Sequence, residues 1–227
     1  MRLILSLILI SAFQISNAQE TRKLSDFDEV SAATGIKVLL VKSSETKAIV
    51  EIENGDPDDV ITEVKGSRLQ VKYDNNNWNR SNRNRKAKVT VHYKSINEIG
   101  VSSGAMVSAE NEIDADKLDL GGSSGGIMEL DVDCSELTVD ISSGGVLRIS
   151  GSTRSLDIDV SSGGILKGEE LDCENANADA SSGGVATFKV KDMLDADASS
   201  GGSIRYIGNP EKIRSNSSSS GSIKARS

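Results

Sequence analysis

The stretch that decides the fold is DISSGGVLRI, residues 140–149, which returns almost unchanged as DVSSGGILKG at residues 159–168. The tripeptide Ser-Ser-Gly occurs seven times, and its copies begin at residues 102, 123, 142, 161, 181, 199 and 219. Self-similarity at such a period is typical of a solenoid, in which each coil buries its apolar side by stacking on its neighbours. We therefore predict a solenoid of about 19–20 residues per coil over residues 102–227.

The segments on either side of each Ser-Ser-Gly alternate between apolar and polar residues. LTVDI (residues 137–141) and LDIDV (156–160) precede two of the copies, and VLRIS (146–150) follows one. A period of two places successive side chains on opposite sides of a β-strand. Because no helical periodicity interrupts this half, we predict an all-β chain, a β-helix whose last and mostly polar coil caps the open end.

The repeated serines and glycines have a mechanical explanation. Each coil needs a sharp corner, glycine reaches backbone angles that other residues avoid, and stacked corners leave little room for side chains. A phosphate-binding nest or a nucleophilic serine is the functional alternative, but a nucleophile needs a base, and the single histidine, His92, lies outside the repeats. We expect Gly163→Val to crowd the stacked coils, and we predict no catalytic and no cofactor-binding residues.

The residues before the repeats form two further segments. Residues 1–18 combine one positive charge, an apolar run and small residues before position 19, which is the pattern of a secretory signal peptide. Residues 19–101 contain alternating stretches between turn signals, which predict an N-terminal, antiparallel-like β region. Within it, Asp56-Pro57 predicts one helical turn and Gly66-Ser67 a two-residue hairpin loop. We expect a protein exported to the periplasm, the cell surface or the medium, without a membrane span.

A polar loop at residues 74–88 surrounds the one tryptophan of the chain with Asn and Arg residues. An exposed Trp78 could stack on a sugar ring, and Arg80 and Arg83 could pair with an acidic partner. A variable loop tip is the alternative explanation. We name Trp78, Arg80 and Arg83 as candidate ligand-binding residues, with an envelope protein or a glycan as the partner.

Four aspartates occupy the same place, two residues before Ser-Ser, in successive coils: Asp140, Asp159, Asp179 and Asp197. Stacking would space these carboxylates about 4.8 Å apart, where each pair repels by roughly 1 kcal/mol even in water-like surroundings. Calcium prefers several carboxylate oxygens and could relieve this repulsion. Neighbouring Lys and Arg, or solvation, could do so too. These four residues are the candidate metal ligands, and calcium is the candidate ion.

The two cysteines provide a test of the coil register. Cys134 and Cys173 each lie eight residues before a Ser-Ser pair, and Thr153 holds the matching place in the coil between them. In register, their Cα atoms are about 9.6 Å apart, which exceeds the roughly 7 Å that a disulfide spans. We predict that Cys134 and Cys173 are not bonded to each other, although two cysteines in an exported protein invite a disulfide.

Composition narrows the classes of function. Residues 102–227 hold 21 Asp and Glu against 11 Lys and Arg, so attraction to nucleic acid or to an anionic membrane is reversed. A polysaccharide-acting β-helix enzyme needs clustered carboxylates beside a groove with aromatic residues, and the repeats offer only Phe188 and Tyr206.

The stretches FDEVSAATGIKVLLVK, ITEVKGSRLQVKY and KVTVHYKSINEIGVSSGA, together with the Ser-Ser-Gly coils, resemble the head GIN domain family of auto-transporter adhesins. The resemblance covers about Thr21 to Ser227. It implies an exported β-solenoid of the Bacteroidetes type with no catalytic residues to carry over. The favoured hypothesis is a non-enzymatic structural or adhesin-like module of the bacterial envelope. The alternatives are a calcium-binding solenoid and a polysaccharide-acting enzyme.

Overall fold

The computed structural model describes residues 18–74, 85–218 and 220–226. Within these ranges seventeen strands join into one sheet, and no helix has the length and apolarity needed to cross a membrane. In chain order the elements are β1 (Ala18–Lys23), β2 (Glu29–Ala32), β3 (Lys37–Lys42), β4 (Lys47–Glu53), the 3₁₀ turn η1 (Pro57–Asp59), β5 (Val60–Lys65), β6 (Arg68–Tyr73), β7 (Lys86–Tyr93), β8 (Glu98–Val101), β9 (Met106–Ala109), β10 (Ile113–Gly122), β11 (Ile127–Ile141), β12 (Val146–Val160), β13 (Ile165–Ala180), β14 (Val185–Ala198), β15 (Ser203–Ile207), β16 (Lys212–Ser217) and β17 (Ser222–Arg226).

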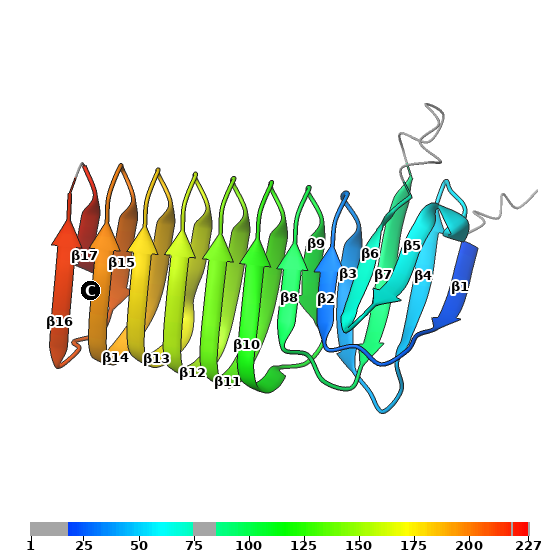
Figure 1. The fold of residues 1–227 in the computed structure, drawn as a ribbon, viewed down its shortest axis with the longest axis horizontal. Coiled ribbons are helices and arrows are strands. Elements are labelled where there is room, and N and C mark those ends of the chain that lie inside the picture. The colour runs from blue at the N-terminus through cyan, green and yellow to red at the C-terminus, as the bar shows by residue number, and fades with distance from the viewer. Residues whose placement is uncertain (1–17, 75–84, 219, 227) are drawn as a thin grey trace, which may run out of the picture.

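The predicted solenoid is confirmed. Strands β10 to β14 pair in parallel, each coil on the next, and β16 and β17 close the C-terminal end (Figure 1). Each coil has one tight corner. At the opposite edge the chain bends without leaving the strand, so β11, β12 and β13 each run from one corner to the next. We call these two margins the corner edge and the bent edge.

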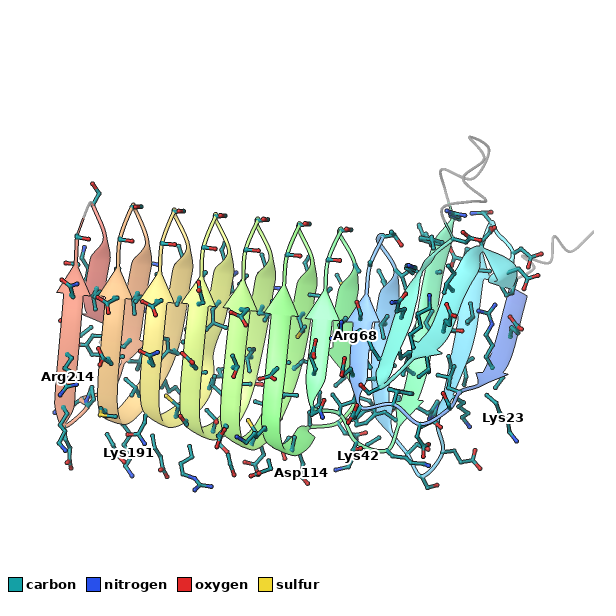
Figure 2. All side chains as sticks on the ribbon, in the orientation of Figure 1. Lys23, Lys42, Arg68, Asp114, Lys191 and Arg214 are labelled. Carbon is teal, nitrogen blue, oxygen red and sulfur yellow. The ribbon has the colours of Figure 1, made fainter. Side chains whose placement is uncertain are left out.

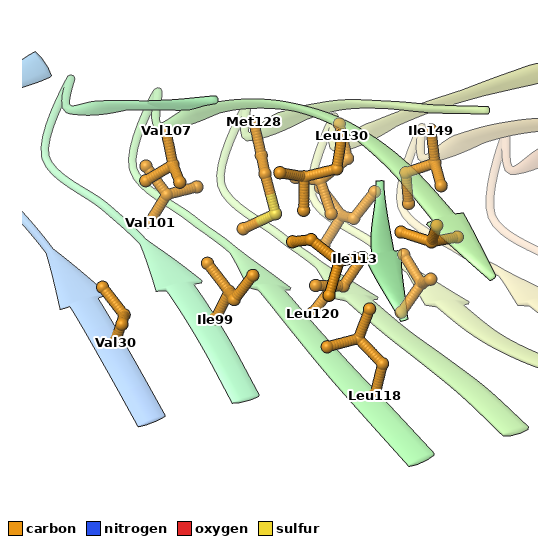
Figure 3. Packing of buried hydrophobic residues seen from close by; sticks show 14 of the residues in the cluster. Val30, Ile99, Val101, Val107, Ile113, Leu118, Leu120, Met128, Leu130 and Ile149 are labelled. Atoms are coloured by element: carbon orange, nitrogen blue, oxygen red, sulfur yellow. The ribbon is translucent and has the colours of Figure 1, made fainter. Parts of the chain in front are cut away.

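Two flat outer faces lie between the edges. Face A contains the strands that enter the corners, namely β2, β8, β10, the C-terminal halves of β11 to β14, and β16. Face B contains the strands that leave them, namely β3, β9, the N-terminal halves of β11 to β14, β15 and β17. Alternation sends every second side chain of both faces inwards, so Ile99 and Leu120 from face A meet Val107 and Met128 from face B in the core (Figure 3).

The corner is a type I′ turn. In Ser161–Gly164 the N–H of Gly164 donates to the carbonyl of Ser161 over 2.8 Å, and Ser162 and Gly163 have φ of 49° and 73°. A Cβ on Gly164 would lie 2.8 Å from the carbonyl oxygen of Ile141 in the preceding coil, whereas one on Gly163 would meet nothing within 4 Å. The expectation that Gly163 is the crowded position is therefore wrong. The first glycine provides the positive φ, and the second allows the coils to stack.

The last corner differs from the expected register by one residue. Its turn is closed by the N–H of Gly221 donating to Ser218 over 2.9 Å, so Gly221 takes the place of the second glycine. Ser220, with φ of 68°, takes the place of the first. All six residues of β16 are exposed.

The coil geometry extends into residues 19–101, which lack the Ser-Ser-Gly motif. β2 and β3 pair in parallel with β8 and β9, and between them Thr34 and Gly35 have φ of 62° and 76°. Residues 33–36, ATGI, therefore build a corner with the same pair of positive φ angles as SSGG, because a threonine can occupy the left-handed position that serine holds elsewhere. Antiparallel strands follow, as predicted: β4 pairs with β1 and β7, and β5 pairs with β6. The helical turn at Asp56-Pro57 and the hairpin at Gly66-Ser67 are both present.

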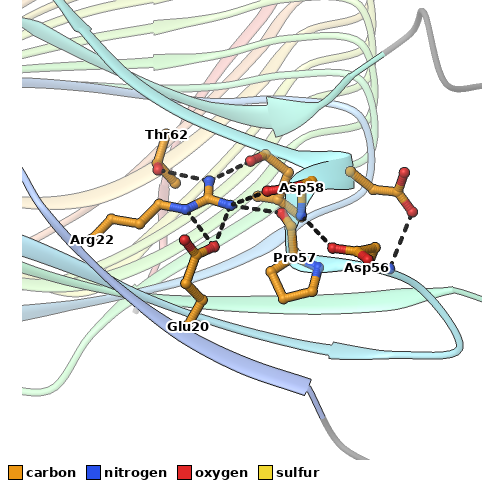
Figure 4. Close-up of polar contacts among 8 residues, drawn as sticks. Glu20, Arg22, Asp56, Pro57, Asp58 and Thr62 are labelled. Carbon is orange, nitrogen blue, oxygen red and sulfur yellow. Dashed lines mark hydrogen bonds and ion pairs between the residues drawn. The ribbon is translucent and has the colours of Figure 1, made fainter.

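A polar cluster fastens β1 onto this N-terminal end. The Arg22 guanidinium contacts Glu20 at 2.6 Å and donates to the carbonyl of Pro57 at 2.8 Å and to the Thr62 hydroxyl at 3.1 Å (Figure 4). One side chain thus joins an edge strand, η1 and β5. It supplies several charge-assisted hydrogen bonds where the solenoid has no further coil to stack on.

The core is a set of inward columns, as the alternation predicts. Leu137, Val139 and Ile141 are at most 2 % exposed. Later coils substitute alanines at residues 176–180, and the next coil contributes the fully buried Phe188. Small residues near a large one keep the interior filled at native density.

Candidate binding surfaces

The bent edge carries a shallow trough of about 850 Å³. Its lining includes Cys134, Thr153 and Cys173, with charged side chains such as Asp114 and Lys191 on its rims. Figure 2 shows Lys42, Asp114 and Lys191 projecting from this edge, whereas the corner edge carries short side chains. The trough is open, and the described residues contain no group of three or more His, Cys, Asp and Glu placed to hold a metal ion.

The cysteines stack as predicted. Thr153 pairs with Cys134 on one side and with Cys173 on the other, and both cysteines are free. Burial raises the pKa of Cys134 and raises that of Cys173 to about 12. Because the thiolate is the reactive form, both groups are chemically quiet at neutral pH.

The four aspartates form the expected column on face A. The register aligns Asp140, Asp159, Asp179 and Asp197 in successive coils. Desolvation, followed by repulsion from neighbouring aspartates, raises the pKa of Asp140 and of Asp179. The carboxylates are aligned, but within the part of the chain that the structure describes they do not form a metal cluster. Calcium binding stays a prediction.

Face B carries two parallel columns that the sequence reasoning missed. The first is apolar and half-exposed and runs through five coils: Met106, Ile127, Val146, Ile165 and Val185. The second stands two residues further along each strand and is mainly basic, with exposed Glu129, Arg148, Lys167, Arg205 and Lys224. The buried Thr187 interrupts it between Lys167 and Arg205. The sequence contains both columns as the outward residues of each strand that follows a corner. Alternation alone does not identify them, because an outward position can hold an apolar or a charged residue.

A hollow of about 430 Å³ lies on face A opposite the first coils of these columns. Gly100 and Gly121, paired across β8 and β10, form part of its floor, and Asp140 stands at its rim. Neither glycine has a positive φ, and a Cβ on Gly121 would meet nothing within 4 Å. Because glycine has no Cβ, these two positions leave open space on face A. Glycine in a strand costs stability, and the backbone angles here do not require it.

The predicted ligand-binding residues Trp78, Arg80 and Arg83 lie outside the described residues. The ends of their loop are described and well anchored. Arg85 lies 3.5 Å from the buried Asp59 and stacks on the Tyr73 ring, whose hydroxyl accepts a hydrogen bond from the Ala87 N–H. A hollow of about 520 Å³ adjoins this root, with Lys37, Lys86 and Lys88 in its lining and Glu51 and Glu53 among them.

His92 lies half-buried on β7 between buried neighbours, where desolvation and then Lys47 lower its pKa. His92 thus lies on an outer strand face, and no serine or cysteine of the described residues is hydrogen-bonded to it.

Comparisons with known proteins agree with this fold. The model of the family described as "putative auto-transporter adhesin, head GIN domain" matches residues 26–210. A protein from Bacteroides fragilis described as a putative adhesin has a TM-score of 0.79 at 21% identity, over 94% of this chain and 98% of its own. Two proteins from Parabacteroides distasonis, described as a putative lipid binding protein and a putative adhesin, have TM-scores of 0.72 at 20% and 18% identity, each over 93% of this chain and 97% of its own. No curated protein matches the sequence significantly.

Proposed function

Since the chain belongs to the head GIN domain family, whose description is "putative auto-transporter adhesin", we propose that it is an exported, non-enzymatic module that binds an anionic glycan or an acidic envelope protein. The observation that carries the proposal is the loop root beside η1. Other corners of the solenoid turn in four residues, whereas twelve residues, 74–85, connect the end of β6 at Tyr73 to the start of β7 at Lys86. Insertions on a rigid scaffold are where binding residues concentrate.

Charge at this root indicates the class of ligand. Lys37, Lys86 and Lys88 outnumber Glu51 and Glu53 in the lining of the adjoining hollow, and Arg80 and Arg83 belong to the sequence that connects β6 to β7. Arginine and lysine near one aromatic residue suit a sugar that carries carboxylate or sulfate groups, because the ring can stack while the cations pair with the anions. The acidic coils that follow would disfavour an anionic ligand elsewhere on the molecule.

A glycan array with matched neutral and anionic sugars tests this proposal. We expect binding to anionic glycans, and at least a tenfold loss in the triple variant Trp78→Ala, Arg80→Ser, Arg83→Ser. The double variant Arg154→Ser, Lys191→Ser, which removes two cations from the bent edge, is the control and should bind like the wild type. Equal binding by the triple variant and the wild type would reject the loop as the site, and release of new reducing ends from a polysaccharide would reject the non-enzymatic function.

Calcium binding by the aspartate column is the second candidate function. Its support is the register of the four aspartates, which brings like charges together. Desolvation first, and then repulsion from neighbouring aspartates, raises the pKa of Asp140 and Asp179. An ion bound only by the folded state raises the melting temperature. Millimolar calcium should therefore raise it in the wild type but not in the double variant Asp159→Asn, Asp179→Asn. A flat calcium titration of the wild type rules the site out.

A further inference from the structure

We propose that copies of this protein associate side by side, with face A of one copy against face B of the next and with their solenoid axes parallel. The association requires no ligand at the loop, so its test is independent of the adhesive function proposed above. Three features of the two faces carry it, and they agree in register.

The first feature is a pair of unmatched charge columns. Asp140, Asp159, Asp179 and Asp197 on face A form no ion pair with a Lys or Arg of the described residues. The same holds for the exposed cations of face B in the described part of the chain: Arg148, Lys167, Arg205 and Lys224. The aspartates repel one another along face A, and on face B Arg148 repels Lys167 and Arg205 repels Lys224. A partner of the opposite charge relieves that repulsion.

The second feature is the level of each charge along the axis. Asp140 and Arg148 flank the same corner, Asp159 and Lys167 flank the next, and Asp197 and Arg205 flank a later one. The basic column has one acidic member, Glu129. The residue that flanks the same corner on face A, in the position of the aspartates, is the uncharged Gly121. A second copy beside the first, in the same coil register, thus places a cation opposite each of Asp140, Asp159 and Asp197, and Glu129 opposite a glycine. Asp179 lies at the level of the buried Thr187, and Lys224 at the level of Asn216.

The third feature is a fit of shape at the N-terminal coils. Met106, which is 39 % exposed, belongs to the apolar column of face B and flanks the same corner as Gly100. Ile127 likewise flanks the same corner as Gly121. The hollow over the two glycines on face A therefore lies at the level of the two bulky apolar residues on face B. A neighbouring copy would fill the hollow and remove apolar surface from water, which gives the exposed glycines a function.

Because the two contacting faces differ, the contact is heterologous and does not close on itself. A copy that uses face A still offers face B, so association should give rows of increasing length rather than a dimer. Charge pairing at exposed columns is screened by salt, with a Debye length of about 8 Å at physiological ionic strength, so the rows should shorten as salt is added.

A charge-swap experiment by sedimentation velocity tests the pairing. One variant reverses face A (Asp140→Lys, Asp159→Lys) and the other reverses face B (Arg148→Glu, Lys167→Glu). We expect the mature wild type to grow in mass with concentration at low salt, and each variant alone to stay monomeric because its faces repel. An equal mixture should assemble again, since each reversed face then meets its complement in the other variant. The control Arg154→Glu, Lys191→Glu changes the net charge as the face B variant does, but on the bent edge, and should assemble like the wild type.

Gly121→Val tests the fit of shape without disturbing the fold, because a side chain there meets only open space and valine suits a strand. We expect an unchanged or higher melting temperature and at least a tenfold weaker association. A wild type that remains monomeric at every concentration would overturn the proposal, as would a mixture of reversed variants that fails to assemble. Dissociation by calcium beyond that caused by sodium chloride of equal ionic strength would support the proposal, because the ion would then compete with face B for the aspartates.

Discussion

The corner edge and the bent edge reverse the chain in different ways. At the corner edge seven Ser-containing turns repeat the same hydrogen bond, and the first six of them the same pair of positive φ angles. At the bent edge the strand continues, and the coils differ: Gly151 pairs with Val132 on one side and with Leu171 on the other. A tight turn allows few residue types, so its sequence repeats from coil to coil. A gradual bend tolerates many sequences, and here it leaves a trough along the edge.

The largest expected effect breaks the corner. A side chain on Gly184 would overlap the carbonyl oxygen of Val160 in the coil below, while Gly183, with φ of 77°, faces open space. We expect Gly184→Val to lower the free energy of unfolding by about 3 kcal/mol through overpacking. Gly183→Val should cost about 1–2 kcal/mol for its strained backbone. Denaturant unfolding followed by circular dichroism measures both, and a greater loss at Gly183 would mean that stacking does not set the glycine requirement.

The next effect concerns the bent edge and its cysteines. Alkylation of the denatured, unreduced wild type should modify both Cys134 and Cys173, because Thr153 lies between them. In the folded protein at pH 8 we expect Cys173 to react on the order of a thousandfold more slowly than in the unfolded chain, since burial raises its pKa from 9.0 to about 12 and so lowers the thiolate fraction.

The variant Thr153→Cys sharpens the test. It places a third thiol about 4.8 Å from each of the others along the column, within reach of a disulfide. After oxidation, mass spectrometry of this variant should find one alkylated cysteine rather than three. Three labelled thiols would indicate that the coils at the bent edge are not in the register described.

The smallest expected effect on stability comes from the aspartate column of face A. Asp179→Asn removes like-charge contacts with Asp159 and Asp197, so without calcium it should raise the free energy of unfolding by about 0.5 kcal/mol at pH 7. The pKa of Asp179 is raised in the folded state, so its penalty is complete above that raised pKa. The penalty disappears as the pH falls from there toward the ordinary value of 3.8. Wild type and variant should therefore converge in stability near pH 3, and a difference that grows on acidification would contradict the assigned cause.

Much of the fold could be predicted because a solenoid is local in sequence. The place of Cys134, Thr153 and Cys173 in one column follows from counting residues to the next corner, and the structure has that register. Counting residues between Ser-Ser-Gly copies fails where the chain forms the same corner from different residues. Residues 33–36 build a corner without Ser-Ser-Gly: Thr34 and Gly35 have the two positive φ angles, and Ile36 stands where most other corners have a second glycine. Backbone angles therefore constrain this corner more than the identity of its side chains does.

By itself, the sequence determined the strand alternation, the period, the corners and the unbonded cysteines, because each depends on contacts between neighbouring coils. Only the tertiary structure decided which glycine of each pair is crowded, because that depends on the carbonyl of the preceding coil. Only the structure placed Met106 and Gly100 at one level on opposite faces, and matched the aspartate column of face A to the cations of face B. Outward positions lie in water within one chain and can hold almost any residue. Which of these outward residues lie side by side on one face is decided only when the coils are stacked.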